Sequence, residues 1–297
     1  MSIASKWSPQ ARARIAVTLL MLIWGNTFLV TKSAVTELSP LVAAALRYII
    51  ATAVLVPVAL MRGGLGNLPS PRPYAMLFAL GLIGVTLYYT FFNLALMYGT
   101  ASQGALVQAL LPASIALSAV IGLKEKLSRR RIAGIMLSIA GVALLVGAGA
   151  STDDLAAPDP LLGGLLMIAA VVCWGVYTSL AKRLAHADLV IVTVWISFIG
   201  MLMLLPFAAY ELHSAPLPRV SLQAWLGLIY LGVVASALGF IIYNRVLRDL
   251  DASEVGVYVN LVPIVGVMSA MLFLGETLQP AQFVGGAIAL AGMWLAS

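Results

Sequence analysis

The hydrophobic residues of this chain fall into ten long runs that are separated by short polar connections. The runs cover approximately residues 12–34, 40–61, 74–97, 101–122, 129–148, 161–183, 188–210, 222–246, 252–274 and 279–296. A helix needs about twenty residues to cross the hydrocarbon core of a bilayer. The runs do not alternate between apolar and polar positions, as the strands of a membrane barrel would. The pattern therefore predicts an all-α integral membrane protein with ten transmembrane helices.

The composition agrees with a chain that has lipid as its main solvent. Hydrophobic residues make up 62% of the 297 residues and charged residues only 9%, whereas soluble domains carry about 25% charged residues. The first run, Ile15–Val30, follows three basic residues but is long for a signal peptide and lacks a convincing cleavage site, so we expect a retained helix. The lone Cys173 excludes an intramolecular disulfide.

The basic residues predict the orientation of the helices. If the N-terminus is cytoplasmic, fourteen Lys and Arg residues lie on that side, and only Lys32 and Arg219 lie on the other. The fourteen are Lys6, Arg12, Arg14, Arg62, Arg72, Lys124, Lys126, Arg129, Arg130, Arg131, Lys182, Arg183, Arg245 and Arg248. The positive-inside rule then places both termini in the cytoplasm. It also explains the net charge of +6 without nucleic acid, so the expected partners are the lipid bilayer and a small-molecule substrate.

The second half of the chain repeats the first. Trp24-Gly25 recurs as Trp174-Gly175, 150 residues later. From the third helix the offset is 151, and it pairs Asn93 with Asn244, Ala101-Ser102 with Ala252-Ser253, Pro112 with Pro263, Glu125 with Glu276, Gly134 with Gly285 and Gly141 with Gly292. Each copy holds five helices, an odd number, so the second copy enters the membrane from the opposite side. We predict two inverted five-helix repeats, residues 12–148 and 161–296, an arrangement typical of transporters. A fused pair that serves only as a scaffold is the alternative.

Several of these motifs resemble those of the EamA-type drug/metabolite transporter superfamily. They are Trp24-Gly25-Asn26-Thr27-Phe28 and its echo Trp174-Gly175, the stretch from Ser39-Pro40-Leu41 to Arg47, the prolines of the fourth and ninth helices, and Leu274-Gly275-Glu276-Thr277-Leu278. The first copy departs at Lys124, where glycine is usual. The resemblance covers nearly the whole chain, and the chain is also similar to the bacterial branch that exports aromatic and other amino acids. It implies a location in the bacterial inner membrane and a central cavity lined by helices 1, 3, 4, 6, 8 and 9, with helices 5 and 10 at the periphery.

Polar and aromatic residues within the predicted helices are the candidates for substrate binding. They are Trp24, Asn26, Tyr88, Tyr89, Asn93, Gln108, Trp174, Tyr177, Tyr243, Asn244 and Asn260. Buried amides need partners, and these partners are either a substrate or polar groups of neighbouring helices. The two readings stay open for each amide. Trp24 and Trp174 lie too deep for an interfacial belt, so we expect them to be cavity walls rather than packing residues.

Two prolines and one arginine are further candidates. Pro112 and Pro263 lie near the middle of the fourth and ninth helices, where proline frees a carbonyl one turn earlier. Their matched positions favour hinges over tolerated kinks. Arg47 is the one charge well inside a helix, and an intramembrane charge indicates function by default. It lies about two turns from the outer end of the helix, so its side chain could extend outward to the interface. It could also bind a substrate carboxylate or cap helix ends in the bundle, and we favour the capping role.

These features favour a transporter that exports small metabolites, chiefly aromatic and other neutral amino acids, by alternating access. No acidic residue lies in the central third of any predicted helix, which favours a facilitator or exchanger over a proton-coupled pump. Efflux of amphipathic organic cations or drugs is the alternative, although it would favour an accessible carboxylate in the cavity. An intramembrane enzyme would need converging acids, histidines or a nucleophile–base pair, and the sequence supplies none.

No cofactor, metal site or catalytic residue is expected. The sequence has no phosphate-binding loop and no zinc motif. The matched glycines Gly134, Gly141, Gly285 and Gly292 recur at intervals of seven, which places each pair on one helix face. We read this spacing as close helix packing, and we favour a monomer over a homodimer.

Overall fold

The computed structural model describes residues 8–65, 74–123, 127–149, 157–184, 187–214, 219–250, 255 and 258–296. Helices are the only regular secondary structure in this part of the chain. Eight helical segments are long and apolar enough to cross a membrane, and two shorter apolar helices, Leu261–Leu274 and Pro280–Ala296, follow them. The prediction of an all-α membrane protein is confirmed.

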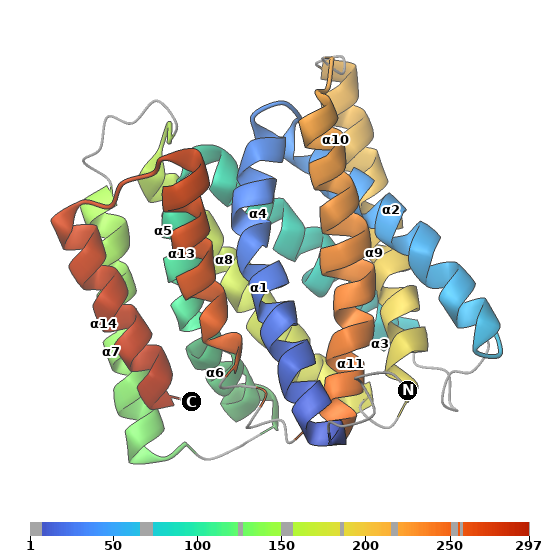
Figure 1. Cartoon of the computed structure of the whole chain (residues 1–297), viewed down its shortest axis with the longest axis horizontal. Helices are drawn as coiled ribbons and strands as arrows, with labels where there is room; N and C mark the ends of the chain where they lie inside the picture. The colour runs from blue at the N-terminus through green and yellow to red at the C-terminus, as the bar shows by residue number, and fades with distance from the viewer. Residues whose placement is uncertain are drawn as a thin grey trace.

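The first half of the chain forms five helical rods. They are α1 (Pro9–Val35), α2 (Pro40–Met61), the joined α3 (Tyr74–Gly81), η2 (Leu82–Leu87) and α4 (Tyr88–Tyr98), the joined α5 (Ala101–Val107), η3 (Gln108–Leu110) and α6 (Leu111–Leu123), and α7 (Arg129–Gly149). The rods run up and down the bundle (Figure 1). The end at which α1 begins is called the terminal end here, and the opposite end is called the far end.

The second half continues in the same manner. The sixth rod is α8 (Pro160–Ala181) with η4 (Lys182–Leu184), and the seventh is α9 (Leu189–Ser214). The eighth joins α10 (Leu222–Ile229), η5 (Tyr230–Leu238) and α11 (Gly239–Asp249), the ninth contains α13 (Leu261–Leu274), and the tenth is α14 (Pro280–Ala296). The helix α14 ends at the terminal end (Figure 1). Three helices begin at the prolines expected to start them, Pro40, Pro160 and Pro280, because the missing N–H of proline has no partner to lose in a first turn.

Four rods are interrupted where the sequence predicted unbroken helices. The segments η2 and η5 are π-helical and lie at matched positions in the third and eighth rods. The fourth rod tightens to a 3₁₀ turn in η3, one turn before Pro112, because proline clashes with the preceding carbonyl and removes a helical hydrogen bond. In the ninth rod, α13 begins directly after Asn260, so Pro263 lies in its first turn. Both prolines therefore mark helix breaks, while hinge movement remains a prediction.

Close contacts recur at the spacing of the sequence repeat. A Cβ atom on Gly25 would overlap Val265, and a Cβ atom on Gly175 would overlap Ser114. Val265 lies 151 residues after Ser114, so each half makes the same contact to the other. Two halves related by a two-fold axis would give this reciprocity. It supports the predicted inverted repeats, which stay part of the proposal below.

The helices α7 and α14 form the most extensive helix pair of the structure. A Cβ atom on Gly134, Gly141, Gly285 or Gly292 would overlap the backbone of the partner helix. The expected close packing is therefore confirmed. The pair lies at one edge of the bundle (Figure 1), and its outer face exposes large apolar side chains such as Met136 and Phe283. This position matches the peripheral place that the family resemblance implied for these helices.

Candidate functional site

A small cavity lies within the bundle between α2, η2, α8, α9 and α11. Its lining residues are Tyr48, Gly84, Val85, Trp174, Tyr177, Thr193, Ile196, Ser197 and Phe240, and its volume is about 10 Å³. This is about the space that one water molecule needs, so a substrate the size of an amino acid requires the walls to move. The lining comes from rods 2, 3, 6, 7 and 8. It differs from the family expectation by including rods 2 and 7 and leaving out rods 1, 4 and 9.

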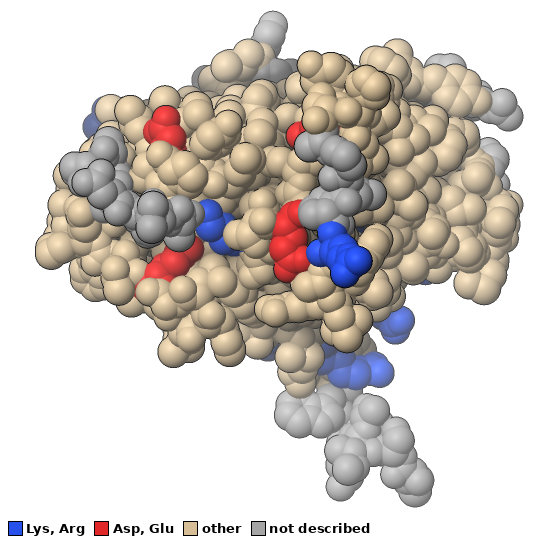
Figure 2. Space-filling model, turned by 90° about the horizontal axis from the view of Figure 1, so that it is seen from above, with Lys and Arg blue, Asp and Glu red and all other residues tan. Residues whose placement is uncertain are grey.

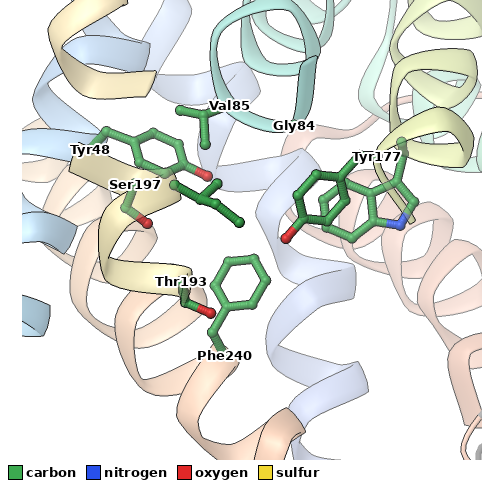
Figure 3. A pocket seen from close by; sticks show the side chains of 9 residues that line it. Tyr48, Gly84, Val85, Tyr177, Thr193, Ser197 and Phe240 are labelled. Carbon is green, nitrogen blue, oxygen red and sulfur yellow. The ribbon is translucent and has the colours of Figure 1, made fainter. Parts of the chain in front are cut away.

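Aromatic side chains border this region on the sides of both α2 and α8. Tyr48, Tyr89, Tyr88, Trp174 and Tyr177 make a continuous series, with ring centroids 4.9, 4.7, 5.1 and 5.2 Å apart in that order. We call these five residues the aromatic cluster. Such edge-to-face and tilted contacts are favoured by the ring quadrupoles. Tyr48 and Tyr177 face each other across the cavity with their hydroxyl groups directed into it (Figure 3). The cluster therefore presents a rigid apolar surface together with polar hydroxyl groups.

Arg47 lies beside the aromatic cluster and is only 5% exposed. Its Nε donates to Ser236 Oγ at 3.0 Å, one terminal nitrogen donates to the Tyr89 hydroxyl at 3.3 Å, and its Cζ lies 4.4 Å from the centre of the Tyr89 ring. Within the described part of the chain its five N–H donors make these two hydrogen bonds and no ion pair. Both bonds go to side chains. The structure thus differs from the helix-end capping that the sequence favoured for Arg47.

Lys32 performs the capping role instead. Its Nζ donates to the carbonyl oxygens of Leu96 and Gly99 at 2.8 and 2.7 Å. These groups end α4, where the last carbonyls of a helix lack intrahelical donors and the helix dipole favours a cation. Lys32 is 6% exposed, so the two basic residues buried in the described chain have different tasks. Lys32 satisfies a helix end, whereas Arg47 faces side chains near the cavity.

The two matched tryptophans occupy different environments. Trp174 lines the cavity and contacts Tyr88 and Tyr177, as expected for a wall. Trp24 does not line this cavity. Its indole N–H donates to the carbonyl of Ala235 at 3.0 Å, and its ring contacts Phe240 and Tyr243. Trp24 therefore supports the wall from behind, through Phe240.

The amide candidates divide in the same way. Gln108 donates to the Tyr88 hydroxyl at 3.3 Å and so contacts the aromatic cluster. Asn26 accepts from Ser269 and donates to Leu22, and Asn93 donates to the carbonyl of Pro40. These two amides join helices, although the buried Oδ1 of Asn93 has no partner in the structure. Asn260 is buried where α13 begins. The side chain of Asn244 lies outside the described residues.

Several residues near the site were not among the sequence candidates. Tyr48, Thr193, Ser197 and Phe240 line the cavity, and Ser236 holds Arg47. Thr193 and Ser197 are four residues apart, a spacing that places two hydroxyl groups on one helix face and that could have indicated them. The π-helical segments have no comparable signal, although such segments are frequent at functional sites. No group of three metal-ligating side chains occurs in the described part of the chain.

The long apolar helical segments define a multi-pass α-helical membrane protein. The sequence profile of the EamA-like transporter family matches residues 12–147 and again residues 161–297. The chain belongs to this family.

Several similar proteins are named as transporters, efflux pumps or exporters. An uncharacterized transporter of Archaeoglobus fulgidus is 32% identical over 96% of this chain and 97% of its own length. A probable amino-acid metabolite efflux pump of Salmonella typhimurium is 29% identical over 93% of this chain and 92% of its own. A probable terminal-alkyne amino-acid exporter of Streptantibioticus cattleyicolor is 28% identical over 82% of this chain and 80% of its own. A solved crystal structure with 25% identity superimposes with a TM-score of 0.64 and covers 96% of each chain.

Proposed function

We propose that this transporter exports neutral and aromatic amino acids by alternating access between two inverted halves, residues 12–148 and 161–296. The reciprocal glycine contacts between the halves support this arrangement. In the proposal the protein is a monomer in the bacterial inner membrane, with both termini cytoplasmic. The excess of Lys and Arg in the segments at the terminal end supports that orientation.

The observation that carries the proposal is the environment of Arg47. A buried guanidinium without an anionic partner is costly, and none of the described Asp or Glu residues makes an ion pair with it. The carboxylate of an amino acid would supply the missing anion through the fork geometry that arginine offers. We therefore assign Arg47 to the substrate carboxylate.

The aromatic cluster fits the rest of such a substrate. Its rings offer apolar surface to an aromatic or aliphatic side chain. Ring faces also attract an ammonium group, and the hydroxyl groups of Thr193 and Ser197 lie on the same cavity. A neutral amino acid has one anionic, one cationic and one apolar part. The cavity region offers Arg47 to the anionic part, the ring faces to the cationic part and the apolar ring surface to the apolar part.

Transport requires the narrow cavity to open alternately at its two ends. The helix breaks at Pro112 and Pro263 lie in matched rods of the two halves. We assign them as hinges about which the helix segments rotate when the two halves exchange conformations. Each hinge frees a helix segment to rotate without breaking an intact hydrogen-bond ladder, because the break already exists.

An organic cation is the competing substrate, since aromatic walls suit cations as well. The position of Arg47 argues against it, because a fixed positive charge beside the cluster repels a substrate that has no carboxylate. The relatives named for amino-acid efflux and export also support the amino-acid reading.

Counterflow in proteoliposomes tests the substrate class. Vesicles that contain the purified protein are loaded with unlabelled compound and exposed to labelled phenylalanine, leucine, glucose or a lipophilic cation. The proposal expects accumulation of phenylalanine and leucine only, without an imposed proton gradient. Accumulation of the cation and of neither amino acid would replace this function by the alternative.

A further inference from the structure

Three carboxylates at the far end each bridge the two halves of the chain. Each accepts hydrogen bonds from the N-cap or the first turn of a helix that belongs to the other half. Acidic side chains are visible on this face, together with a few basic ones (Figure 2). The arrangement resembles ordinary helix capping in its chemistry, but the caps are supplied from across the boundary between the halves.

Glu276 and Glu211 reach from the second half to the first. The two oxygens of Glu276 accept from the backbone N–H groups of Ala101 and Ser102, both at 2.7 Å, at the start of α5. One oxygen of Glu211 accepts from Leu41 and Val42, both at 3.0 Å, at the start of α2. The first N–H groups of a helix have no intrahelical acceptor, so each carboxylate satisfies donors that would otherwise need water.

Glu37 reaches in the opposite direction, from the first half to the second. Its oxygens accept from the backbone N–H and the hydroxyl of Ser221, both at 2.7 Å, at the start of α10. These hydrogen bonds lower the pKa of Glu37 below its ordinary value. The bridge therefore holds its charged form at neutral pH.

A fourth acidic residue at this end provides a contrast. The side chain of Asp159 accepts from Leu162 of its own helix, α8. This side-chain bond would survive any movement of one half against the other. The bonds of Glu37, Glu211 and Glu276 would not, because donor and acceptor lie on opposite halves.

We propose that Glu37, Glu211 and Glu276 form a three-point latch that keeps the far end closed and must release before that end can open. The latch rests on the proposed movement of the halves, but it does not depend on the identity of the substrate. Charged hydrogen bonds are about twice as strong as neutral ones. Removing the charge from the partly buried bridge of Glu211 or Glu276 should lower the ratio of closed to open molecules by about tenfold, and removing it from the exposed bridge of Glu37 should lower the ratio by less.

Spin-label distances across the far end test the latch. In a Cys173→Ser background, labels at the exposed Thr36 and His213 mark the first and second halves. The distances are measured by pulsed electron paramagnetic resonance in liposomes without substrate. The triple variant Glu37→Gln, Glu211→Gln, Glu276→Gln should gain a population at longer distance. The matched control Asp159→Asn should keep the wild-type distribution.

The outcomes separate the latch from the proposed function. An unchanged distance distribution in the folded triple variant overturns the latch even if amino acids are transported. A longer distance supports it even if counterflow shows a different substrate. Should the triple variant fail to fold, the single variants Glu37→Gln and Glu211→Gln give the same reading, with a lengthened distance supporting the latch and unchanged distances in both overturning it.

Discussion

The Nε atom of Arg47 lies 3.0 Å from the hydroxyl oxygen of Ser236. This hydrogen bond links α2 of the first half to the π-helical segment η5 of the second. The buried charge therefore lies where the two halves meet. Any movement of one half against the other changes the surroundings of the guanidinium, as a transport cycle requires of a binding group.

Replacing Ser236 with alanine should weaken substrate binding without unfolding the protein. The guanidinium loses one of its two hydrogen-bond partners and is held less firmly. A hydrogen bond of this kind is worth about 1 kcal/mol, so KM for phenylalanine should rise about fivefold, with a smaller change in the maximal rate. Ser179→Ala is the control, because the Ser179 hydroxyl is buried but has no partner in the structure. Equal KM values for both variants and the wild type would count against Ser236 as a positioning residue.

Replacing Trp174 and Trp24 should have different consequences, although the two occupy matched places in the sequence. Trp174 lines the cavity, so Trp174→Ala should alter transport more than it lowers the melting temperature. Trp24 packs behind the cavity and bonds Ala235. Its loss should therefore damage stability first, although by less than the loss of about 3–5 kcal/mol for a fully buried residue, because Trp24 is only partly buried.

Both tryptophan effects are measured by thermal melting and counterflow on the same preparations. If Trp174→Ala melts far below the wild type yet transports normally per folded molecule, Trp174 is a packing residue and its assignment to the site is wrong.

Adding a single methyl group at Gly141 should push the helices α7 and α14 apart. A Cβ atom at Gly141 would overlap the backbone of Ala289, and overpacking of this kind costs about 1–3 kcal/mol. Gly141→Ala should therefore lower the melting temperature. Gly147 lies on the same helix with no neighbouring atom within 4 Å of its Cβ position. Gly147→Ala should be neutral or stabilising, because alanine favours a helix by about 1 kcal/mol. A loss of stability in Gly147→Ala and none in Gly141→Ala would contradict this packing.

The orientation can be tested with single cysteines in the Cys173→Ser background. Ser128 lies just before α7 at the terminal end, and Thr36 directly follows α1 at the far end. An impermeant maleimide added to intact cells should label a cysteine at position 36 but not one at position 128. Labelling of both from outside would contradict the inverted halves, because an even number of crossings would then lie between the two positions and the first half would contain an even number of helices.

Much of the fold could be predicted from the sequence because lipid imposes a simple rule. Runs of about twenty apolar residues must be helices, and the starts at Pro40, Pro160 and Pro280 follow from the chemistry of proline. The close packing of Gly141 against α14 was also predictable, because only small residues allow two helix backbones to approach closely.

The site could be predicted only in part. Trp24 and Trp174 look equivalent in the sequence, yet one bonds a carbonyl of the π-helical segment η5 and the other lines the cavity. In a chain that is apolar on every helix face, the hydrophobic pattern does not reveal which face points inwards. For that reason Tyr48 and Phe240 could not be distinguished from lipid-facing aromatic residues, whereas the charge of Arg47 marked it as a candidate for function.

The central claim is that Arg47 recognises the carboxylate of the substrate. The most direct measurement compares counterflow of phenylalanine with that of phenethylamine, which lacks only the carboxylate, in the wild type, Arg47→Gln and Arg62→Gln. Losing one partner of a buried charged pair costs about 2–5 kcal/mol. The account therefore predicts that Arg47→Gln lowers kcat/KM for phenylalanine by about thirtyfold or more and abolishes the preference over phenethylamine. The exposed Arg62→Gln, at the other end of the same helix, should keep both properties. An Arg47→Gln protein that folds and retains the wild-type preference for phenylalanine would contradict the account.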